Sequence, residues 1–206
     1  MSFDLWLAFT AASCALLLVP GPTVLLVLSY ALSKGRSVAV ACAAGVAFGD
    51  FVAMTASLLG LGALVLASAT AFMVLKWLGA AYLVWLGIKM IRSAPRGTLA
   101  PTKTMQTKSV FGNAATVTAL NPKSIAFFIA FVPQFIQPQA ALLPQFAVLI
   151  ATFVTLAGLN ALAYALLADR LRQNISRPRV LTSITRLGGA TLIGMGLATA
   201  TLRRAT

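Results

Sequence analysis

The stretch at residues 5–33, LWLAFTAASCALLLVPGPTVLLVLSYALS, carries no charged residue and has Pro20-Gly21-Pro22 near its middle. A spanning helix needs about 20 apolar residues, so this stretch is long enough to cross a bilayer. Each proline lacks an N–H and clashes with the carbonyl four residues earlier, here those of Leu16 and Leu18. Lipid cannot satisfy the freed carbonyls, so the broken backbone must pack against protein or line a cavity. A plain proline kink is the alternative, but two prolines around a glycine favour a transporter-type binding site.

The composition predicts an integral membrane protein. Hydrophobic residues make up 60% of the 206 residues and charged residues 9%, whereas soluble domains have about 25% charged residues. The net charge of +13 does not indicate nucleic-acid binding, because the basic residues fall between apolar stretches, as the positive-inside rule expects. The apolar stretches predict six spans, at residues 5–32, 38–65, 70–91, 111–136, 142–168 and 183–202.

Most enzyme chemistry lacks the residues it needs in this chain. There is no histidine, and the only acidic residues are Asp4, Asp50 and Asp169. Catalysis by paired carboxylates, histidine-based triads and zinc sites are all unsupported. We therefore expect no enzyme, no metal site and no other cofactor. Cys14 and Cys42 both lie in apolar spans, where cysteine behaves as a small hydrophobe, and we expect no disulfide.

The basic residues also predict the topology. They gather in the loops after the first, third and fifth spans, which places these loops in the cytoplasm and both termini outside. Arg203 and Arg204 argue mildly against this orientation. The third loop, about residues 93–110, is the one real linker, and it divides a single membrane domain into residues 1–92 and 111–206. Gly60 and Gly62 predict the end of the second helix.

The two halves of the chain resemble each other. Residues 78–87 align without gaps with residues 187–196, and five of the ten positions are identical. Pro20-Gly21-Pro22 falls opposite Asn121-Pro122-Lys123, and Asp50 falls opposite Asn160. Each half has an odd number of helices, so the second copy must be inverted, as in secondary transporters whose sites form where broken helices meet. We expect an all-α membrane protein of two inverted three-helix repeats. Chance similarity between Leu-, Ala- and Gly-rich helices is the alternative.

Asp50 is the first candidate for chemistry. It follows Gly45-x3-Gly49, a spacing that puts both glycines on one helix face and lets another backbone approach closely. A carboxylate in hydrocarbon costs about 3 kcal/mol on insertion scales, so Asp50 is expected to face a cavity or a partner. It could take up and release a proton during a transport cycle. The alternative is a structural carboxylate permanently paired with a lysine.

Lys123 has two interpretations. Asn121-Pro122 is an ordinary helix start, with Asn as the cap and Pro in the first turn, which would leave Lys123 at the membrane interface. However, residues 124–136 supply only about 20 Å of helix, less than the hydrocarbon core of about 30 Å. The preceding residues must then supply the rest, which draws Lys123 inward. Inside the membrane its obvious counter-ion is Asp50.

Together these residues suit a zwitterion. Carbonyls freed by Pro20 and Pro22 suit an ammonium group, while Lys123 and the helix N-terminus after Pro22 suit a carboxylate. The candidate site residues are Pro20, Gly21, Pro22, Asp50, Asn121, Lys123 and Asn160.

Other polar residues have plainer explanations. Hydrogen bonding between helices explains Asn160 and Gln134 as well as ligand binding does. Tyr30 and Tyr164 are expected to be packing or interface residues rather than ligands.

Several motifs taken together resemble the LysE/RhtB family of bacterial lysine exporters and homoserine/threonine efflux proteins, over nearly the whole chain. They are Pro20-Gly-Pro-Thr, Gly45-x3-Gly49-Asp50, Gly79-Ala-Ala-Tyr-Leu-x3-Gly87, Asn121-Pro-Lys-x3-Phe127-Phe and Pro133-Gln-Phe135. The resemblance implies an inner-membrane exporter of amino acids or their derivatives, driven by the proton motive force, and family members are commonly dimers. The family's motif residues carry over to Pro20, Gly21, Pro22, Gly49, Asp50, Asn121, Pro122 and Lys123.

The acidic residues also bear on the substrate. An exporter of lysine or arginine needs an acid for the substrate side chain beyond the one used for coupling, and only Asp50 lies well inside a span, with Asp169 at the edge of another. This count, and closer resemblance to the homoserine/threonine branch, favour a small neutral substrate such as threonine, homoserine or homoserine lactone. Divalent metal transport fits poorly. The alternatives are a passive facilitator, a basic-amino-acid exporter, and a non-transporting membrane subunit.

Overall fold

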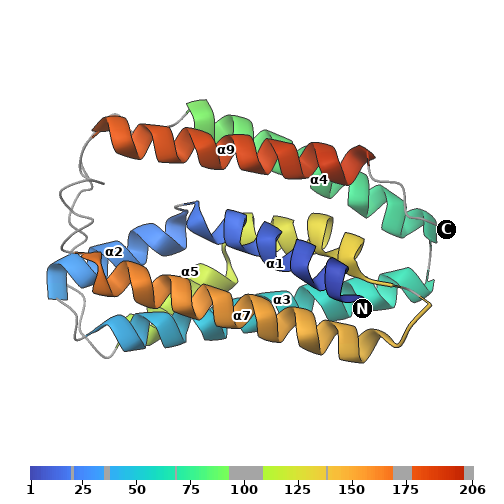
Figure 1. Ribbon diagram of the computed structural model, residues 1–206, viewed down its shortest axis with the longest axis horizontal. Coiled ribbons are helices and arrows are strands. Elements are labelled where there is room, and N and C mark those ends of the chain that lie inside the picture. The colour runs from blue at the N-terminus through green and yellow to red at the C-terminus, as the bar shows by residue number, and fades with distance from the viewer. Residues whose placement is uncertain are drawn as a thin grey trace.

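The computed structural model is built of helices (Figure 1). It describes residues 1–19, 21–34, 38–67, 69–92, 109–137, 139–168 and 178–201, and no strand occurs among them. The elements are α1 (Phe3–Leu18), α2 (Pro22–Lys34), α3 (Ala39–Ala67), α4 (Ala69–Arg92), α5 (Val110–Ala119), α6 (Pro122–Ala126), the π-helix η3 (Phe127–Phe131), the 3₁₀-helix η4 (Val132–Phe135), α7 (Leu142–Leu166) and α9 (Pro178–Thr201).

Most of these helices could cross a membrane. Four segments are long and apolar enough, at Ala39–Gly62, Met73–Arg92, Val110–Phe135 and Leu142–Leu166. The pair α1 and α2, bent by 57° at the break between them, makes a fifth if it is counted as one span. The prediction of a helical membrane protein is therefore confirmed. The sixth predicted span lies in α9, which is not among these candidates, so it stays a prediction.

Both predicted helix breaks are present. The first separates α1 from α2 around Gly21, and Pro20 itself lies outside the described residues. The second separates α5 from α6 at Leu120 and Asn121. The predicted linker at 93–110 lies almost wholly outside the described residues.

The second helix does not end at Gly60 and Gly62, and that prediction was wrong. Helix α3 continues through both glycines to Ala67. A glycine inside a helix costs only about 1 kcal/mol, whereas a break at membrane depth leaves backbone groups that lipid cannot satisfy. The apolar run therefore keeps its helical hydrogen bonds past the two glycines.

Helices α4 and α9 lie side by side and antiparallel along one edge of the molecule (Figure 1). Glycines allow the close approach: a Cβ at Gly87 would lie 2.5 Å from the carbonyl oxygen of Gly189, and one at Gly196 would lie 2.8 Å from that of Ala80. In the alignment of the two halves Gly87 matches Gly196, and Ala80 matches Gly189. The two contacts therefore join equivalent positions of the aligned halves.

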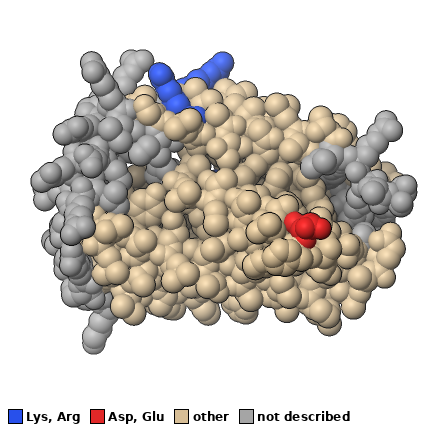
Figure 2. Space-filling view, in the orientation of Figure 1, with Lys and Arg blue, Asp and Glu red and all other residues tan. Residues whose placement is uncertain are grey.

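The helix ends beside the basic loops lie together. The end of α2, the start of α3, the end of α4, the start of α5, the end of α7 and the start of α9 are at the left of Figure 1. The N-terminus and the start of α7 are at the opposite end (Figure 1). Figure 2 shows that the described part of the visible face is almost free of charge, as contact with lipid requires.

The core is rich in aromatic side chains. Phe127 contacts the ring of Phe9 on α1, with centroids 6.4 Å apart, and that of Phe153 on α7, with centroids 5.8 Å apart. Phe131 and Phe135 extend the group, with centroids 5.4 Å apart, and Phe135 returns to Phe9 at 5.5 Å. We call these five residues the aromatic cluster. All five are buried, and three of them lie on η3 and η4, which follow α6 after the second break.

Candidate functional site

The ammonium group of Lys123 lies at the broken end of α1. Its Nζ donates hydrogen bonds to the carbonyl oxygens of Leu16 at 3.0 Å and Val19 at 2.8 Å. The lysine is only 6% exposed. The end of a helix leaves carbonyls without intrahelical partners, and lipid provides none. The structure therefore places Lys123 inside the bundle, where it caps the Val19 carbonyl and shares the Leu16 carbonyl with the backbone N–H of Val19, which donates to it at 3.2 Å.

Two residues of α7 cap the carbonyls of Leu17 and Leu18, which lie between the two carbonyls that Lys123 binds. Asn160 Nδ2 donates to the carbonyl oxygen of Leu17 at 3.1 Å, and the Tyr164 hydroxyl donates to that of Leu18 at 3.1 Å. Asn160 and Tyr164 are four residues apart, so they lie on the same face of α7. The carbonyls of residues 16–19 thus all accept hydrogen bonds from side chains of α6 and α7.

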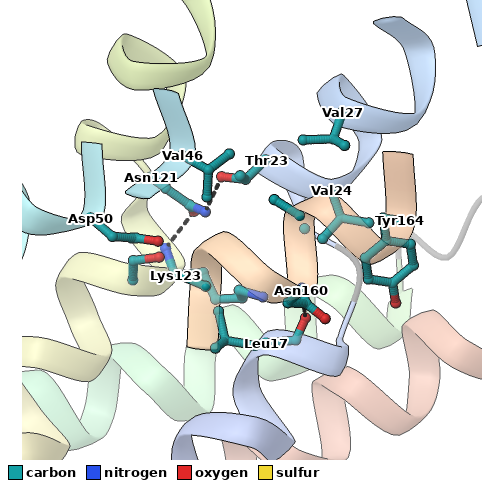
Figure 3. Close-up of a pocket in the computed structure, with 14 residues that line it drawn as sticks. Leu17, Thr23, Val24, Val27, Val46, Asp50, Asn121, Lys123, Asn160 and Tyr164 are labelled. Carbon is teal, nitrogen blue, oxygen red and sulfur yellow. Dashed lines mark hydrogen bonds between the residues drawn. The ribbon is translucent and has the colours of Figure 1, made fainter. Parts of the chain in front are cut away.

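The second break contacts the first. Asn121 caps α6, since its Oδ1 accepts a hydrogen bond from the backbone N–H of Lys123 at 3.0 Å. Its Nδ2 also donates to the Thr23 hydroxyl oxygen of α2 at 3.0 Å (Figure 3). Gly21 lies under the lysine side chain, and a Cβ there would be 3.3 Å from Lys123 Cε. The start of α6 is thus an ordinary capped helix start, and it is also the point where the two broken helices meet.

Asp50 approaches the second break from α3 and is 2% exposed. The Ser124 side chain lines the cavity beside its carboxyl group, and the charge of Lys123 is close enough to act on it. Its Oδ1 has no hydrogen-bond partner in the described part of the chain. The two charged groups form no contact ion pair among the described residues, because the ammonium group binds the carbonyls of α1 instead. Lys123 and Asp50 are therefore electrostatic neighbours rather than a bonded pair.

These side chains enclose a cavity of about 20 Å³ between the two breaks, α3 and α7 (Figure 3). One water molecule needs about 10–15 Å³, so the cavity must widen to admit an amino acid. Pro22 is exposed and does not line it. The lining residues are Leu17, Gly21, Thr23, Val24, Val27, Val46, Asp50, Asn121, Lys123, Ser124, Ala157, Asn160, Ala161 and Tyr164.

Sequence reasoning missed three polar residues of the cavity. Thr23 and Ser124 each follow a break and stand opposite each other in the alignment of the two halves, which is a signal that could have found them. Tyr164 was expected to be a packing or interface residue, but it lines the cavity and caps α1. Its position one helical turn after Asn160 was the available signal.

Two other polar residues serve packing. Gln134 Nε2 donates to the Thr199 hydroxyl oxygen of α9 at 2.7 Å. Of the two explanations of Gln134 drawn from the sequence, this contact is the hydrogen bond between helices. The Tyr30 hydroxyl accepts a hydrogen bond from Asn113 Nδ2 at 2.8 Å, and Tyr30 does not line the cavity.

Comparison with known proteins identifies the family. A model of the LysE type translocator family matches residues 14–203. The chain belongs to the LysE family. A homoserine/homoserine lactone efflux protein of Salmonella typhimurium is 35% identical over 208 residues, which cover all of both chains. An uncharacterized membrane protein of Vibrio cholerae is 35% identical over 98% of this chain and 100% of the relative.

A leucine efflux protein of Klebsiella pneumoniae is 31% identical over 137 residues, which are 66% of this chain and 65% of the relative. No solved structure matches the chain. The family resemblance drawn from the broken-helix motifs is thus confirmed, and this LysE family member is a membrane protein with relatives named for amino-acid efflux.

Asn160→Ala should destabilise this LysE family protein by about 1 kcal/mol, because it leaves the Leu17 carbonyl without its donor. The measurement is the unfolding midpoint of the purified protein in detergent. Thr191→Ala is the matched control, since its hydroxyl donates to the Leu187 carbonyl of its own helix rather than to another helix. Equal midpoints for the two variants would contradict the capping role.

Proposed function

We propose that this LysE family protein exports small neutral amino acids or their derivatives across the bacterial inner membrane in exchange for protons. The substrate class is that of threonine, homoserine and homoserine lactone. One observation carries the proposal: a buried carboxyl group and a buried ammonium group lie in one cavity at the crossing of two broken helices. Broken helices at a midplane cavity are the usual site of secondary transporters, and the named relatives are efflux proteins for homoserine and leucine.

The charges of the cavity support a neutral substrate. A zwitterion brings one positive and one negative group, and the cavity offers Lys123, Asp50 and uncharged polar groups. A lysine or arginine substrate would need a further acid, and Asp4 is exposed on the first turn of α1. Val24, Val27 and Val46 form an apolar wall that suits a short side chain. Asp50 is the proposed proton carrier, because it is the one acidic residue among the described residues that line the cavity.

The proposed architecture is a single domain of two inverted repeats, at about residues 1–92 and 111–206. The matching contacts of Gly87 with Gly189 and of Gly196 with Ala80 support it. So does the exchange of partners at the breaks: Asp50 of α3 faces the second break, and Asn160 of α7 faces the first. The grouping of helix ends beside the basic loops supports a topology with both termini outside (Figure 1).

Transport in liposomes tests the proposal. The purified protein is reconstituted, and the uptake of labelled homoserine, threonine and leucine is measured with and without an imposed pH gradient, beside protein-free liposomes. We expect accumulation of homoserine or threonine above the outside concentration only when the gradient is present. A flux that is the same with and without the pH gradient would indicate a passive facilitator. The absence of flux for all three amino acids would reject this substrate class.

A further inference from the structure

We propose that the side chain of Lys123, when no substrate is bound, occupies the subsite that binds the ammonium group of the substrate. In the absence of substrate, the carbonyls of Leu16 and Val19 bind the lysine. When substrate enters, its ammonium group takes these carbonyls, and the lysine moves to Asp50. The inference rests on the proposed function and adds to it the place where the amino group binds.

The end of α1 has the properties of an ammonium site. Two carbonyl oxygens, those of Leu16 and Val19, converge on one nitrogen at 3.0 and 2.8 Å. They lie at a helix C-terminus, which carries the negative end of the helix dipole. The carbonyls of Leu17 and Leu18 are already bound by the uncharged donors of α7. The pair bound by Lys123 is therefore the pair that another primary ammonium group can take over.

Asp50 supplies the second, independent observation. Its Oδ1 has no hydrogen-bond partner among the described residues, although the side chain is 2% exposed and lines the same cavity. A buried acceptor without a donor is unfavourable, so a donor is expected there in another state of the transport cycle. Lys123 is suited to this role: it lies near Asp50, while its flexible side chain extends toward Leu17 (Figure 3). The described part of the cavity thus has two positions that suit an ammonium group, at the carbonyls of α1 and at Asp50, and one ammonium group, that of Lys123.

The exchange links substrate binding to the loss of a proton. Beside a cation the carboxylate form of Asp50 is stabilised, and without one the neutral acid is preferred in a buried site. When the lysine moves to Asp50, the carboxyl O–H bond breaks, and the proton leaves to water on the side to which the site is open. When Asp50 takes up a proton again, the lysine returns to the carbonyls and excludes the substrate. Within the described chain, the titratable side chains that line the cavity with Asp50 are Lys123 and Tyr164, and the uncharged polar ones are Thr23, Asn121, Ser124 and Asn160.

The test uses Lys123→Ala and a small ammonium compound, so it does not depend on the identity of the substrate. The alanine leaves room for three carbons and a nitrogen, which is the size of n-propylammonium. We expect propylammonium at about 100 times its Kd to raise the unfolding temperature of purified Lys123→Ala by about 5 °C. Tetramethylammonium, which has no N–H donor, should leave it unchanged. Wild type, in which propylammonium must displace the lysine, should respond more weakly at the same concentration, and Lys123→Met, whose side chain fills the space, should not respond.

Lys89→Ala is the matched control, because Lys89 lies over the Trp85 ring on the outer face of α4 and does not line the cavity. Equal responses of Lys123→Ala to the two ammonium compounds, or equal responses of Lys123→Ala and Lys89→Ala to propylammonium, would overturn the inference. If Lys123→Ala fails to fold, it is purified with each compound present. Recovery of monodisperse protein with propylammonium alone supports the subsite, and equal recovery, or no recovery, with both compounds counts against it.

Transport separates this inference from the proposed function. Wild type that accumulates homoserine, combined with a Lys123→Ala variant that propylammonium does not stabilise, would reject the subsite and leave the exporter proposal intact. Stabilisation of Lys123→Ala by propylammonium, combined with no amino-acid flux in wild type, would support the ammonium subsite and reject the proposed substrate class.

Discussion

Asp50→Asn is expected to abolish the accumulation of homoserine that a pH gradient drives. With one proton per substrate, a gradient of one pH unit is worth about 1.4 kcal/mol and sustains a concentration ratio of about tenfold. The amide cannot carry a proton through the cycle, so the ratio should fall to about one. The measurement is the steady-state ratio of labelled homoserine inside and outside proteoliposomes.

Asp4→Asn is the control for this result. Asp4 also lies on a membrane helix, but it is exposed on the first turn of α1 and does not line the cavity. It should keep the full accumulation ratio. If Asp50→Asn accumulates homoserine as wild type does, the proton is carried elsewhere, and the coupling part of the proposed function is wrong.

Gly49→Ala adds a single methyl group, but it should destabilise the folded protein strongly. Helix α3 lies so close to α5 at this position that a Cβ would be 2.8 Å from Thr118 Cβ and 3.0 Å from the backbone nitrogen of Ala119, and it would also meet the Ala115 carbonyl. Backbone cannot move aside as a flexible side chain can, so we expect the upper part of the usual overpacking cost, about 2–3 kcal/mol. Transport should fall as well, because Asp50 is the next residue.

Gly60→Ala on the same helix provides the comparison. A Cβ at Gly60 would have no neighbour within 4 Å in the described part of the chain, so the substitution should be neutral or stabilise the helix by up to about 1 kcal/mol. The unfolding free energies of the two variants in the same detergent check the prediction. A Gly49→Ala variant as stable as Gly60→Ala would mean that α3 and α5 are not packed as closely as described.

The broken helices could be predicted because proline acts locally. A proline removes its own N–H and clashes with a carbonyl four residues away, so Pro20-Gly21-Pro22 and Asn121-Pro122 could be recognised from the chain alone. Asp50 could be singled out for a similar reason, because a carboxylate in an apolar span is costly wherever it points. In both cases the physical cost lies within a few residues of the motif.

The direction of long side chains could not be predicted in this way. Lys123 binds carbonyls more than 100 residues earlier in the chain, and its partner depends on how the two broken helices cross. The sequence offered Asp50 as a counter-ion, whereas the ammonium group lies on the carbonyls of α1. The cap that Tyr164 places on α1 also arises only from tertiary packing. Both contacts come from the meeting of the two halves, which no local pattern encodes.

The narrow cavity and the aromatic cluster have a consequence for the cell. A space of about 20 Å³ holds about one water molecule, and Phe127 and Phe131 lie within one and two turns of Ser124 on the same broken helix. A continuous file of water, along which protons could run freely, does not fit through such a path. Under the proposed exchange mechanism, a membrane carrying many copies of the protein in this conformation would therefore keep its electrochemical potential, and protons would return only together with cargo.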